Sequence, residues 1–195
     1  MVIAMRGKQA KILPDDHLED VLLFAETSRH PLRNKVIVLL SAKAGLRAGE
    51  IAHLTWTMVT DPTGAIGTVL ELPDHAAKKG SGRAIPLHED LRAALSAWRT
   101  ATNSEGPVIV SERSGPMTPQ SIVVWFANAY RVIGLTGCSS HSGRRTFITR
   151  AARLVHEAGG SLRDVQLLAG HRSIQTTERY IDGDTDAQRK LVSLI

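Results

Sequence analysis

Apolar residues recur with helical spacing over most of the chain. The first such stripe follows two aspartates that can cap a helix, and it consists of Leu18, Val21, Leu22 and Ala25. A second helix is expected at about residues 32–44, where Gly45 provides a stop, and a short third helix includes Glu50, Ile51 and Leu54. The first quarter of the sequence therefore predicts three helices.

The pattern changes between about residues 65 and 87. Two β-prone runs, 68–72 and 84–87, flank a polar stretch that contains Gly80 and Gly82. Such runs around a glycine-containing turn are typical of a β-hairpin or a small antiparallel sheet. We therefore expect one small sheet in the middle of a helical protein.

Helical periodicity resumes after this region, with helices expected at about 88–99 and 119–133. A further helix starts near Ser142 and ends at Gly159. Its expected apolar face consists of Phe147, Ala151, Leu154, Val155 and Ala158. Helices at about 162–169 and 173–180 then precede an amphipathic tail helix at 184–195. The predicted fold class is mainly α with a small antiparallel β-sheet or hairpin.

Composition limits the class of protein. Of the 195 residues, 43% are hydrophobic and 22% are charged, which suits a globular domain with a core rather than a disordered chain. The longest purely apolar run, residues 36–40, is too short for a membrane span, and the N-terminus lacks the order of a secretory signal. The single cysteine, Cys138, excludes an internal disulfide and a multi-cysteine metal site, and it favours a cytoplasmic setting.

Basic charge is concentrated in one segment. The formal net charge is +5, and residues 141–180 hold seven arginines against three acidic residues. Charge gathered in this way indicates a polyanionic partner, with nucleic acid first, although a solvated helix face would give the same count.

Four short motifs hold residues suited to phosphate chemistry. In chain order they are Gly45-Leu46-Arg47-Ala48-Gly49-Glu50, the lysine-containing run from Lys78 to Leu87, His141-Ser142-Gly143-Arg144, and Leu168-Ala169-Gly170-His171 with Tyr180 nine residues later. Each alone has an ordinary interpretation. Arg47 can pair with Glu50 at a helix start, the lysines can be solvated turn residues, and Tyr180 can be a packing aromatic. Their occurrence together, in this order, favours a shared chemical role.

This series closely resembles the catalytic domain of the tyrosine recombinases, the phage integrase family, over roughly residues 12–182. The resemblance implies the tyrosine recombinase/integrase catalytic-domain fold as a single domain over 1–195, with a flexible N-terminal segment at 1–11. The tail helix at 184–195 would be exchanged between protomers. Two features depart from the family pattern. Gly143 stands where a leucine is common, and only about a dozen residues precede the first helix, so no N-terminal core-binding domain is expected.

The implied reaction is DNA strand transesterification. The Tyr180 hydroxyl would attack a phosphodiester, giving a 3′-phosphotyrosyl enzyme and a free 5′-hydroxyl. Arg47 and Arg144 would stabilise the charge on the non-bridging oxygens, because planar guanidinium groups match those oxygens and keep their charge. Lys78, or alternatively Lys79, would protonate the leaving 5′-alkoxide.

The other site residues have supporting roles in this interpretation. An ordinary tyrosine hydroxyl has a pKa of about 10, so His141 is expected to accept or relay its proton, whereas His171 would donate to a non-bridging oxygen. Glu50 is expected to be a buried partner of a neighbouring basic group. Further contacts with DNA are expected from Arg83, Arg145 and Arg172. Neither a metal nor a cofactor is expected, because side chains supply the cations.

Three functions are compatible with these residues. The first is a site-specific DNA recombinase of the integrase, excisionase or invertase type. It would act on double-stranded DNA as a homotetramer on synapsed sites, with a monomer as the alternative in free solution. The second is a type IB topoisomerase-like enzyme that relaxes DNA, and the third is a non-catalytic DNA-binding protein on the same fold. The spacing before Tyr180 and the tail after it favour the recombinase, which is expected in the cytoplasm, associated with the nucleoid.

Overall fold

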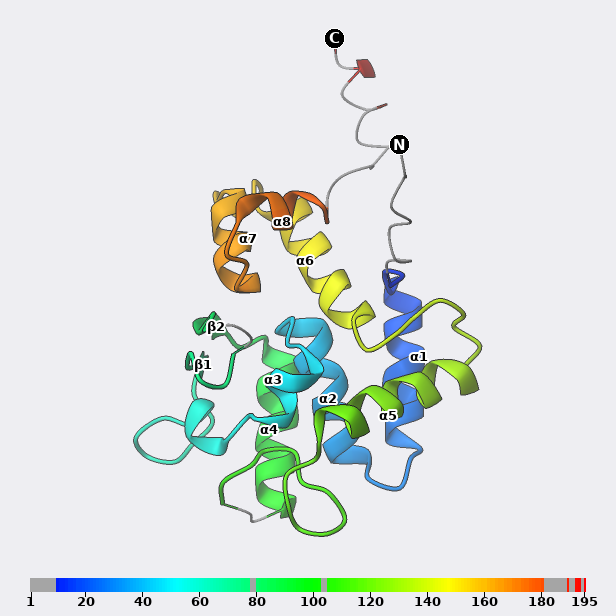
Figure 1. Cartoon of the computed structure of the whole chain (residues 1–195), viewed down its shortest axis with the longest axis vertical. Helices are drawn as coiled ribbons and strands as arrows, with labels where there is room; N and C mark the ends of the chain where they lie inside the picture. Colours follow the sequence, from blue (N-terminus) through cyan, green and yellow to red (C-terminus); the bar gives the residue numbers. More distant parts are fainter. Residues whose placement is uncertain (1–9, 78–79, 103–104, 181–188, 190–191, 194) are drawn as a thin grey trace, which may run out of the picture.

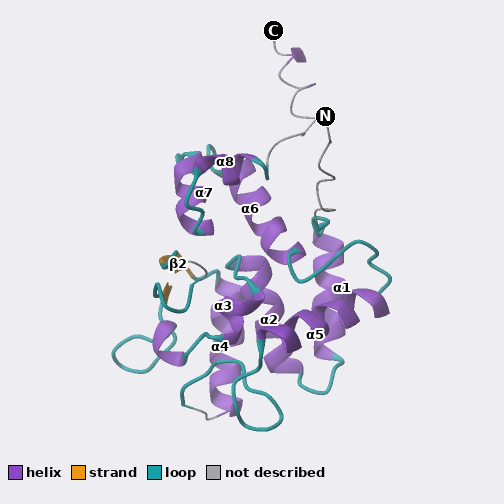
Figure 2. Ribbon diagram, viewed as in Figure 1, coloured by secondary structure: helices purple, strands orange, loops and turns teal. Residues whose placement is uncertain are grey.

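Helices dominate the computed structural model, which describes residues 10–77, 80–102, 105–180, 189, 192–193 and 195 (Figures 1 and 2). The elements, in chain order, are α1 (Asp15–Glu26), α2 (Pro31–Lys43), α3 (Ala48–Ala52), the short 3₁₀ helix η1 (Trp56–Met58), β1 (Val69–Leu72), β2 (Arg83–Pro86), α4 (Glu89–Thr102), α5 (Pro119–Val132), α6 (Ser142–Leu154), α7 (Leu162–Ala169) and α8 (Ile174–Glu178). The predicted fold class, mainly α with a small antiparallel sheet, is confirmed.

The sheet is a two-stranded antiparallel pair within the described ranges, with Val69 opposite Pro86 and Leu72 opposite Arg83. Alternate residues of β1 are buried, so Leu70 and Leu72 face the core while their neighbours face outward. The pairing holds the base of the connecting turn beside the rest of the fold. Lys78 and Lys79, between the two strands in sequence, lie outside the described residues.

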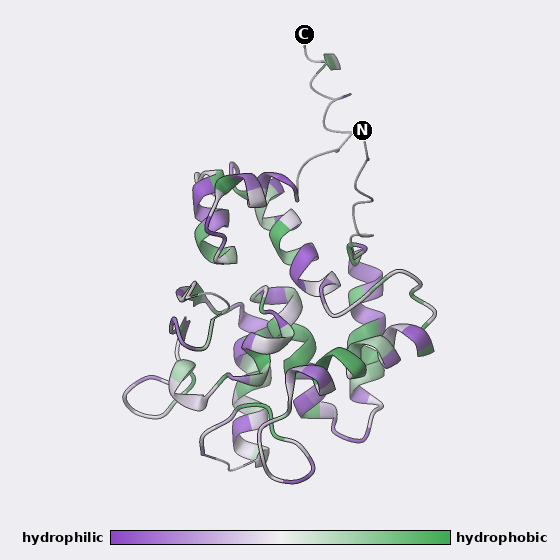
Figure 3. Cartoon of the chain, in the orientation of Figure 1, coloured by the Kyte–Doolittle hydropathy of each residue, from purple (hydrophilic) through white to green (hydrophobic). Residues whose placement is uncertain are grey.

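The main core lies among α1 to α5 and the sheet, and α2 is its central element. Every residue of α2 from Val36 to Ala42 is buried, because α1, α4 and α6 all pack against this helix. A surface helix would show a single apolar stripe, whereas a helix surrounded by others is apolar on all sides. Figure 3 shows the hydrophobic stretches where these helices face one another.

A second, smaller cluster joins α6 to α7. Its buried members are Ile148, Ala152, Val155, Val165 and Ala169. The helix α6 extends from the α1–α5 body, and α7 and α8 lie along its outer part (Figure 1). This helix packs against α2 and also supplies the second cluster, so residues at its first turns lie where the two parts of the fold meet.

The structure corrects the predicted boundaries and buried face of α6. The helix ends at Leu154 rather than near Gly159, and Leu154 is 54% exposed instead of buried. The buried face is the adjacent one, and it includes Arg144, Thr146 and Thr149. Of the predicted face, Val155 is buried and Phe147 and Ala151 pack against the second cluster, whereas Leu154 and Ala158 are exposed. A count of apolar residues misses the three polar side chains that point inward.

The segments predicted at the two ends of the chain lie largely outside the described residues. Residues 1–9 are not described, nor is most of the expected tail helix at 184–195. The last described helix before it, α8, stops at Glu178, so Tyr180 follows the helix rather than ending it. Within the described parts of the chain, no helix has both the length and the apolar character that crossing a membrane requires.

Candidate active site

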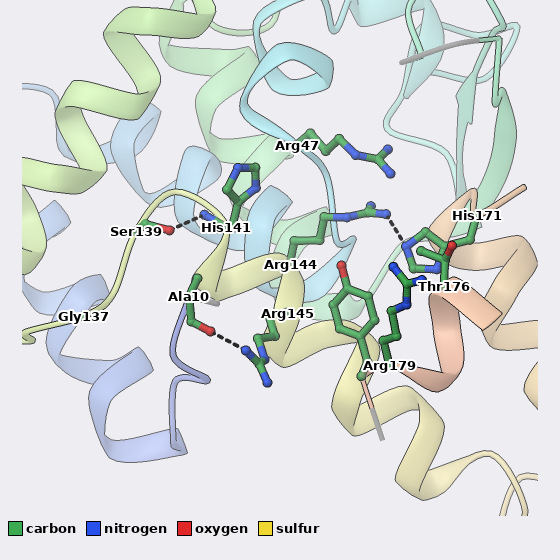
Figure 4. Close-up of a pocket in the computed structure, with 11 residues that line it drawn as sticks. Ala10, Arg47, Gly137, Ser139, His141, Arg144, Arg145, His171, Thr176 and Arg179 are labelled. Carbon is green, nitrogen blue, oxygen red and sulfur yellow. Dashed lines mark hydrogen bonds between the residues drawn. The ribbon is translucent and has the colours of Figure 1, made fainter. Parts of the chain in front are cut away.

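A cleft of about 540 Å³ opens where the first turns of α6 meet the turn before α3 and the end of α8 (Figure 4). Its lining residues are Ala10, Arg47, Gly137, Ser139, His141, Arg144, Arg145, His171, Thr176, Arg179 and Tyr180. Five of the side chains predicted to be catalytic are among them, although they are spread from position 47 to position 180. None of these lining residues is acidic, and four of them are arginines.

Arg47 reaches the cleft from a turn that Gly45 makes possible. Gly45 has φ +64°, a conformation that glycine adopts readily, and a Cβ there would collide with Phe147. Arg47 is the N-cap of α3, where its backbone N–H donates to Glu50 Oε2 at 2.9 Å and its Nη1 donates to Glu50 Oε1 at 2.7 Å. Its side chain remains 22% exposed. The ordinary pairing with Glu50 and the position at the cleft therefore occur together.

Glu50 is buried and holds two arginines. Besides Arg47, it accepts hydrogen bonds from Arg83 Nη1 at 3.2 Å and Nη2 at 3.0 Å. Burial alone would raise the pKa of Glu50, but the hydrogen bonds and charges of Arg83 and Arg47 outweigh it and lower the pKa to about 2. The expectation that Glu50 is a buried partner of a basic group agrees with this placement.

Arg83 faces Glu50 and the end of α7. Its side chain is only 4% exposed, its guanidinium faces Glu50, and its Nε donates to the carbonyl of Leu168 at 2.8 Å. Ion pairing and burial hold this side chain inside the protein, and the expected contact between Arg83 and DNA stays a prediction. It connects β2 to α3 and to the end of α7.

Arg144 is buried in a different way, by carbonyl groups. Its Nη1 donates to Gly45 O at 2.5 Å, and its Nη2 donates to Ala169 O at 2.6 Å. The two carbonyls belong to turns that are distant in sequence, so one guanidinium fixes both turns against α6. Burial, followed by the charge of Arg47, lowers the pKa of Arg144 to about 10, and the group therefore stays charged at neutral pH.

Gly143, the departure from the family pattern, allows α6 to approach α2 closely. A Cβ at this position would overlap Ser41 of α2, whose own Oγ is buried. The contact places the first turn of α6 against the end of α2, which leads directly to the Gly45 carbonyl. It therefore supports the position of Arg144.

His171 contacts both Arg144 and α8. Its Nε2 lies 3.2 Å from Arg144 Nη2, and its Nδ1 lies 2.9 Å from Thr177 Oγ1 (Figure 4 shows the first contact). Burial, followed by the charges of Arg144, Arg47 and Arg83, lowers the pKa of His171 to about 4. The ring is therefore neutral at pH 7 in this structure.

Tyr180 faces the cleft directly after α8. Its ring stacks on that of His171, with centroids 5.4 Å apart and planes 26° from parallel. Its main chain is held at both ends of the residue: the N–H donates to Thr177 O at 2.9 Å, and the carbonyl accepts from Thr149 Oγ1 at 3.3 Å. The side chain is half-buried, so its position is defined while it lines the cleft.

The remaining predicted residues occupy three different settings. His141 is exposed at the N-cap of α6 and lines the cleft. Arg145 also lines the cleft, and its Nη1 donates to Ala10 O at 2.8 Å. Arg172 is exposed in a neighbouring pocket that it shares with the hairpin residues 80–84. The predicted DNA contacts at Arg145 and Arg172 are compatible with these positions.

Two lining or supporting residues were not predicted. Arg179 lines the cleft beside Tyr180. It is one of the seven arginines of residues 141–180, but the sequence did not predict that it belongs to the site. Thr177 is fully buried against His171, and the only available signal was the need of a buried histidine for a polar partner. Among the residues that the structure describes, no three His, Cys, Asp or Glu side chains gather as metal ligands would.

Comparisons with known proteins give one consistent result. The sequence model of the phage integrase family matches residues 11–186. Tyrosine recombinase XerC of Methylobacterium sp. (strain 4-46) is 28% identical over 158 residues, which are 78% of this chain and 46% of the relative. The chain thus spans about half the length of the curated relatives that it matches.

Solved structures show the same fold. The crystal structure of XerA recombinase superposes with a TM-score of 0.74 and 21% identity, and the match covers all of this chain and 66% of the other. A lambda integrase tetramer bound to a Holliday junction gives a TM-score of 0.70 at 21% identity, with coverage of 92% and 50%.

Proposed function

The chain belongs to the phage integrase family, and we propose that it is a tyrosine-type site-specific DNA recombinase. One observation carries this proposal above the others. The side chains of Arg47, His141, Arg144, His171 and Tyr180, from four separate segments, line a single cationic cleft. An ordinary structural role for each residue would not require them to share one site.

The cleft suits a phosphodiester in its transition state. Arg47 and Arg144 supply guanidinium groups to the non-bridging oxygens, where negative charge increases as the nucleophile attacks. Arg144 is fixed in advance by the carbonyls of Gly45 and Ala169, so little reorganisation is needed at the moment of reaction. Such preorganised donors are commonly among the largest contributions to catalysis.

Covalent exchange proceeds in two balanced steps. The Tyr180 oxygen forms a bond to phosphorus while the bond from phosphorus to the 5′-oxygen breaks, and the phenolic proton passes to His141. The leaving 5′-oxygen takes a proton from the hairpin lysine, Lys78 or Lys79, both of which lie outside the described residues. A 5′-hydroxyl from a second strand then attacks the phosphotyrosine and restores Tyr180. No external energy source is consumed.

The partner is double-stranded DNA, and the working assembly is a homotetramer on synapsed sites. The similarity of the fold to a lambda integrase tetramer bound to a Holliday junction supports both statements. The exposed position of Arg172 and the place of Arg145 on the cleft wall support them as DNA contacts. A cytoplasmic, nucleoid-associated location follows from a DNA substrate of this kind.

The test uses the fact that the chain has two tyrosines, Tyr130 and Tyr180. DNA bound by the full chain is selected from a random pool, and the winning sequence is prepared with a nick close to the cleavage site. Cleavage then releases a short fragment that carries the free 5′-hydroxyl, and its loss by diffusion traps the covalent complex. We expect a covalent protein–DNA band with the wild type and no such band with Tyr180→Phe.

Tyr130→Phe is the matched control. Tyr130 is 2% exposed in the main core, and its hydroxyl has no hydrogen-bond partner within the described part of the chain, so this variant should fold and trap DNA normally. Loss of trapping in both variants, or in neither, would overturn the assignment. Plasmid relaxation without synapsis would instead indicate a topoisomerase-like activity.

A further inference from the structure

We infer that Thr177 is a positioning residue whose buried hydroxyl determines which ring nitrogen of His171 carries the proton and which one faces the phosphate. This inference rests on the proposed function, because the phosphate is the group that His171 would meet in the cleft. It adds a residue that lines no part of the cleft itself.

The positions of the two ring nitrogens define the tautomer. A neutral imidazole has one donor nitrogen and one acceptor nitrogen, whereas a guanidinium can only donate. His171 Nε2 faces Arg144 Nη2 at 3.2 Å, so Nε2 must be the acceptor and carry no hydrogen. The ring proton is then on Nδ1, which lies 2.9 Å from Thr177 Oγ1 and donates to it.

Thr177 is well placed to hold this arrangement. The residue is fully buried, so solvent does not compete for the hydrogen bond. It belongs to α8, and its carbonyl accepts the N–H of Tyr180 at 2.9 Å. One threonine therefore contacts the ring of His171 through its side chain and the main chain of Tyr180 through its carbonyl.

The consequence concerns the moment at which DNA enters. In the free protein, burial and the positive charges of Arg144, Arg47 and Arg83 keep the ring of His171 neutral. The ring of Tyr180 stacks on it from the end of α8. A bound phosphodiester adds negative charge, which favours protonation of Nε2 by a proton from solvent. Protonated Nε2 can no longer accept the hydrogen bond from Arg144, so its N–H becomes available to a phosphate oxygen while Nδ1 stays bound to Thr177.

Two substitutions separate the hydroxyl from the shape of the side chain. Thr177→Val keeps the branched shape and removes the acceptor, whereas Thr177→Ser keeps the hydroxyl. Thr146→Val serves as a control, because Thr146 is a buried threonine of α6 that binds the Leu13 N–H and not the site. Thermal unfolding of all three variants, compared with the wild type, identifies any general loss of folding.

The primary readout is the protonation pattern of His171 in the free, full chain, measured by proton–nitrogen correlation spectra with ¹⁵N-labelled histidine at pH 7. The His171 signals are assigned by their loss in His171→Gln. We expect Nδ1–H and bare Nε2 in the wild type, Thr177→Ser and Thr146→Val, and a shift towards Nε2–H in Thr177→Val. An Nε2–H wild type, or a Thr177→Val pattern equal to the wild type, would overturn the inference.

The second readout is single-turnover cleavage of the trapped substrate. Thr177→Val should lower the cleavage rate on the order of tenfold, the effect of one lost buried hydrogen-bond partner, with DNA affinity unchanged and with recovery in Thr177→Ser. If the wild type traps no DNA but the spectra are as expected, the proposed function is wrong and the assignment of the tautomer stands. If the wild type traps DNA but the spectra differ from those expected, the inference about Thr177 is wrong and the proposed function stands.

Discussion

The hairpin side and the α6–α8 side of the cleft each bury an arginine, and they do so by different means. Arg83, 4% exposed, faces the carboxylate of Glu50, whereas Arg144, 3% exposed, faces the carbonyls of Gly45 and Ala169. A carboxylate cancels a positive charge, but a carbonyl only orients it. Burial of an arginine therefore does not show whether its charge remains available to an anion.

The same comparison explains how Arg47 can serve the cleft while it pairs with Glu50. Two arginines share one carboxylate on the hairpin side, so one positive charge remains there. Arg83 is the more buried of the two, and Arg47 is the one whose side chain is 22% exposed at the cleft. With two guanidinium groups on one carboxylate, the net charge of the three groups is +1, and Arg47 is the member that reaches the cleft.

Glu50→Gln is the strongest way to break this comparison. The substitution leaves buried Arg83 without its counter-charge, and removal of one partner from a buried ion pair costs about 3–5 kcal/mol of folding free energy. Urea denaturation measures the loss. Glu112→Gln is the control, because Glu112 is 53% exposed beside Arg29 and an exposed pair contributes about 0–1 kcal/mol. Equal losses in the two variants would contradict the role given to Glu50.

Arg144→Lys tests the carbonyl-held side. A lysine keeps the charge but cannot span two carbonyls and present a planar fork, so preorganisation is lost. We expect the single-turnover cleavage rate to fall by about 10²–10³-fold, as for the loss of one preorganised donor, while DNA affinity changes little. A rate close to that of the wild type would show that charge alone, without geometry, is sufficient at this position.

Lowering the pH should weaken the contact between Arg83 and Glu50 and leave the contacts of Arg144 with main-chain carbonyls intact, because a carboxylate takes up a proton in this range and a carbonyl does not. The pKa of Glu50 is lowered from 4.5 to about 2, so its contribution is present above pH 4.5 and is lost as the pH falls from there towards 2. A shift of this size corresponds to about 3 kcal/mol of folding free energy.

The lowered pKa of His171 acts in the same direction between about pH 6.5 and 4, since the unfolded chain binds the proton more readily. Urea denaturation across pH measures both, and Glu50→Gln should flatten the lower window.

Gly143→Ala gives the smallest expected effect and sharpens the account of how Arg144 is placed. The added methyl overlaps Ser41, and overpacking of this kind costs about 1–3 kcal/mol. Gly49→Ala is the matched control, because nothing lies within 4 Å of a Cβ there, and alanine in a helix is favoured over glycine by about 0.5–1 kcal/mol. Thermal unfolding distinguishes a loss in the first variant from a gain in the second. A gain in both would show that the approach of α6 to α2 is loose.

The sequence predicted the site better than it predicted the surroundings of the site. Arg47, Arg144, His171 and Tyr180 were selected because their motifs, in that order, resemble those of the tyrosine recombinases, and the structure brings these side chains to one cleft. The order of motifs does not indicate burial, so Arg83 was expected to contact DNA like Arg145. Only the folded chain brings Arg83 beside Glu50.

The buried face of α6 and the role of Thr177 could not be predicted for a related reason. Polar residues such as Thr146 and Thr149 face inward because they bind main-chain groups of Leu13 and Tyr180, which are far away in sequence. A helical periodicity based on apolar residues gives such positions no weight. The helices themselves, by contrast, depend on local spacing, and most of them were found within a few residues.

The central claim is that Tyr180 forms the covalent bond to DNA inside the cleft. Its most direct test is mass spectrometry of the trapped complex after digestion of both protein and DNA. The account predicts one modified peptide, with a 3′-phosphate-linked nucleotide on Tyr180 and an unmodified Tyr130. A nucleotide on any other side chain, or linkage through a 5′-phosphate, would contradict it.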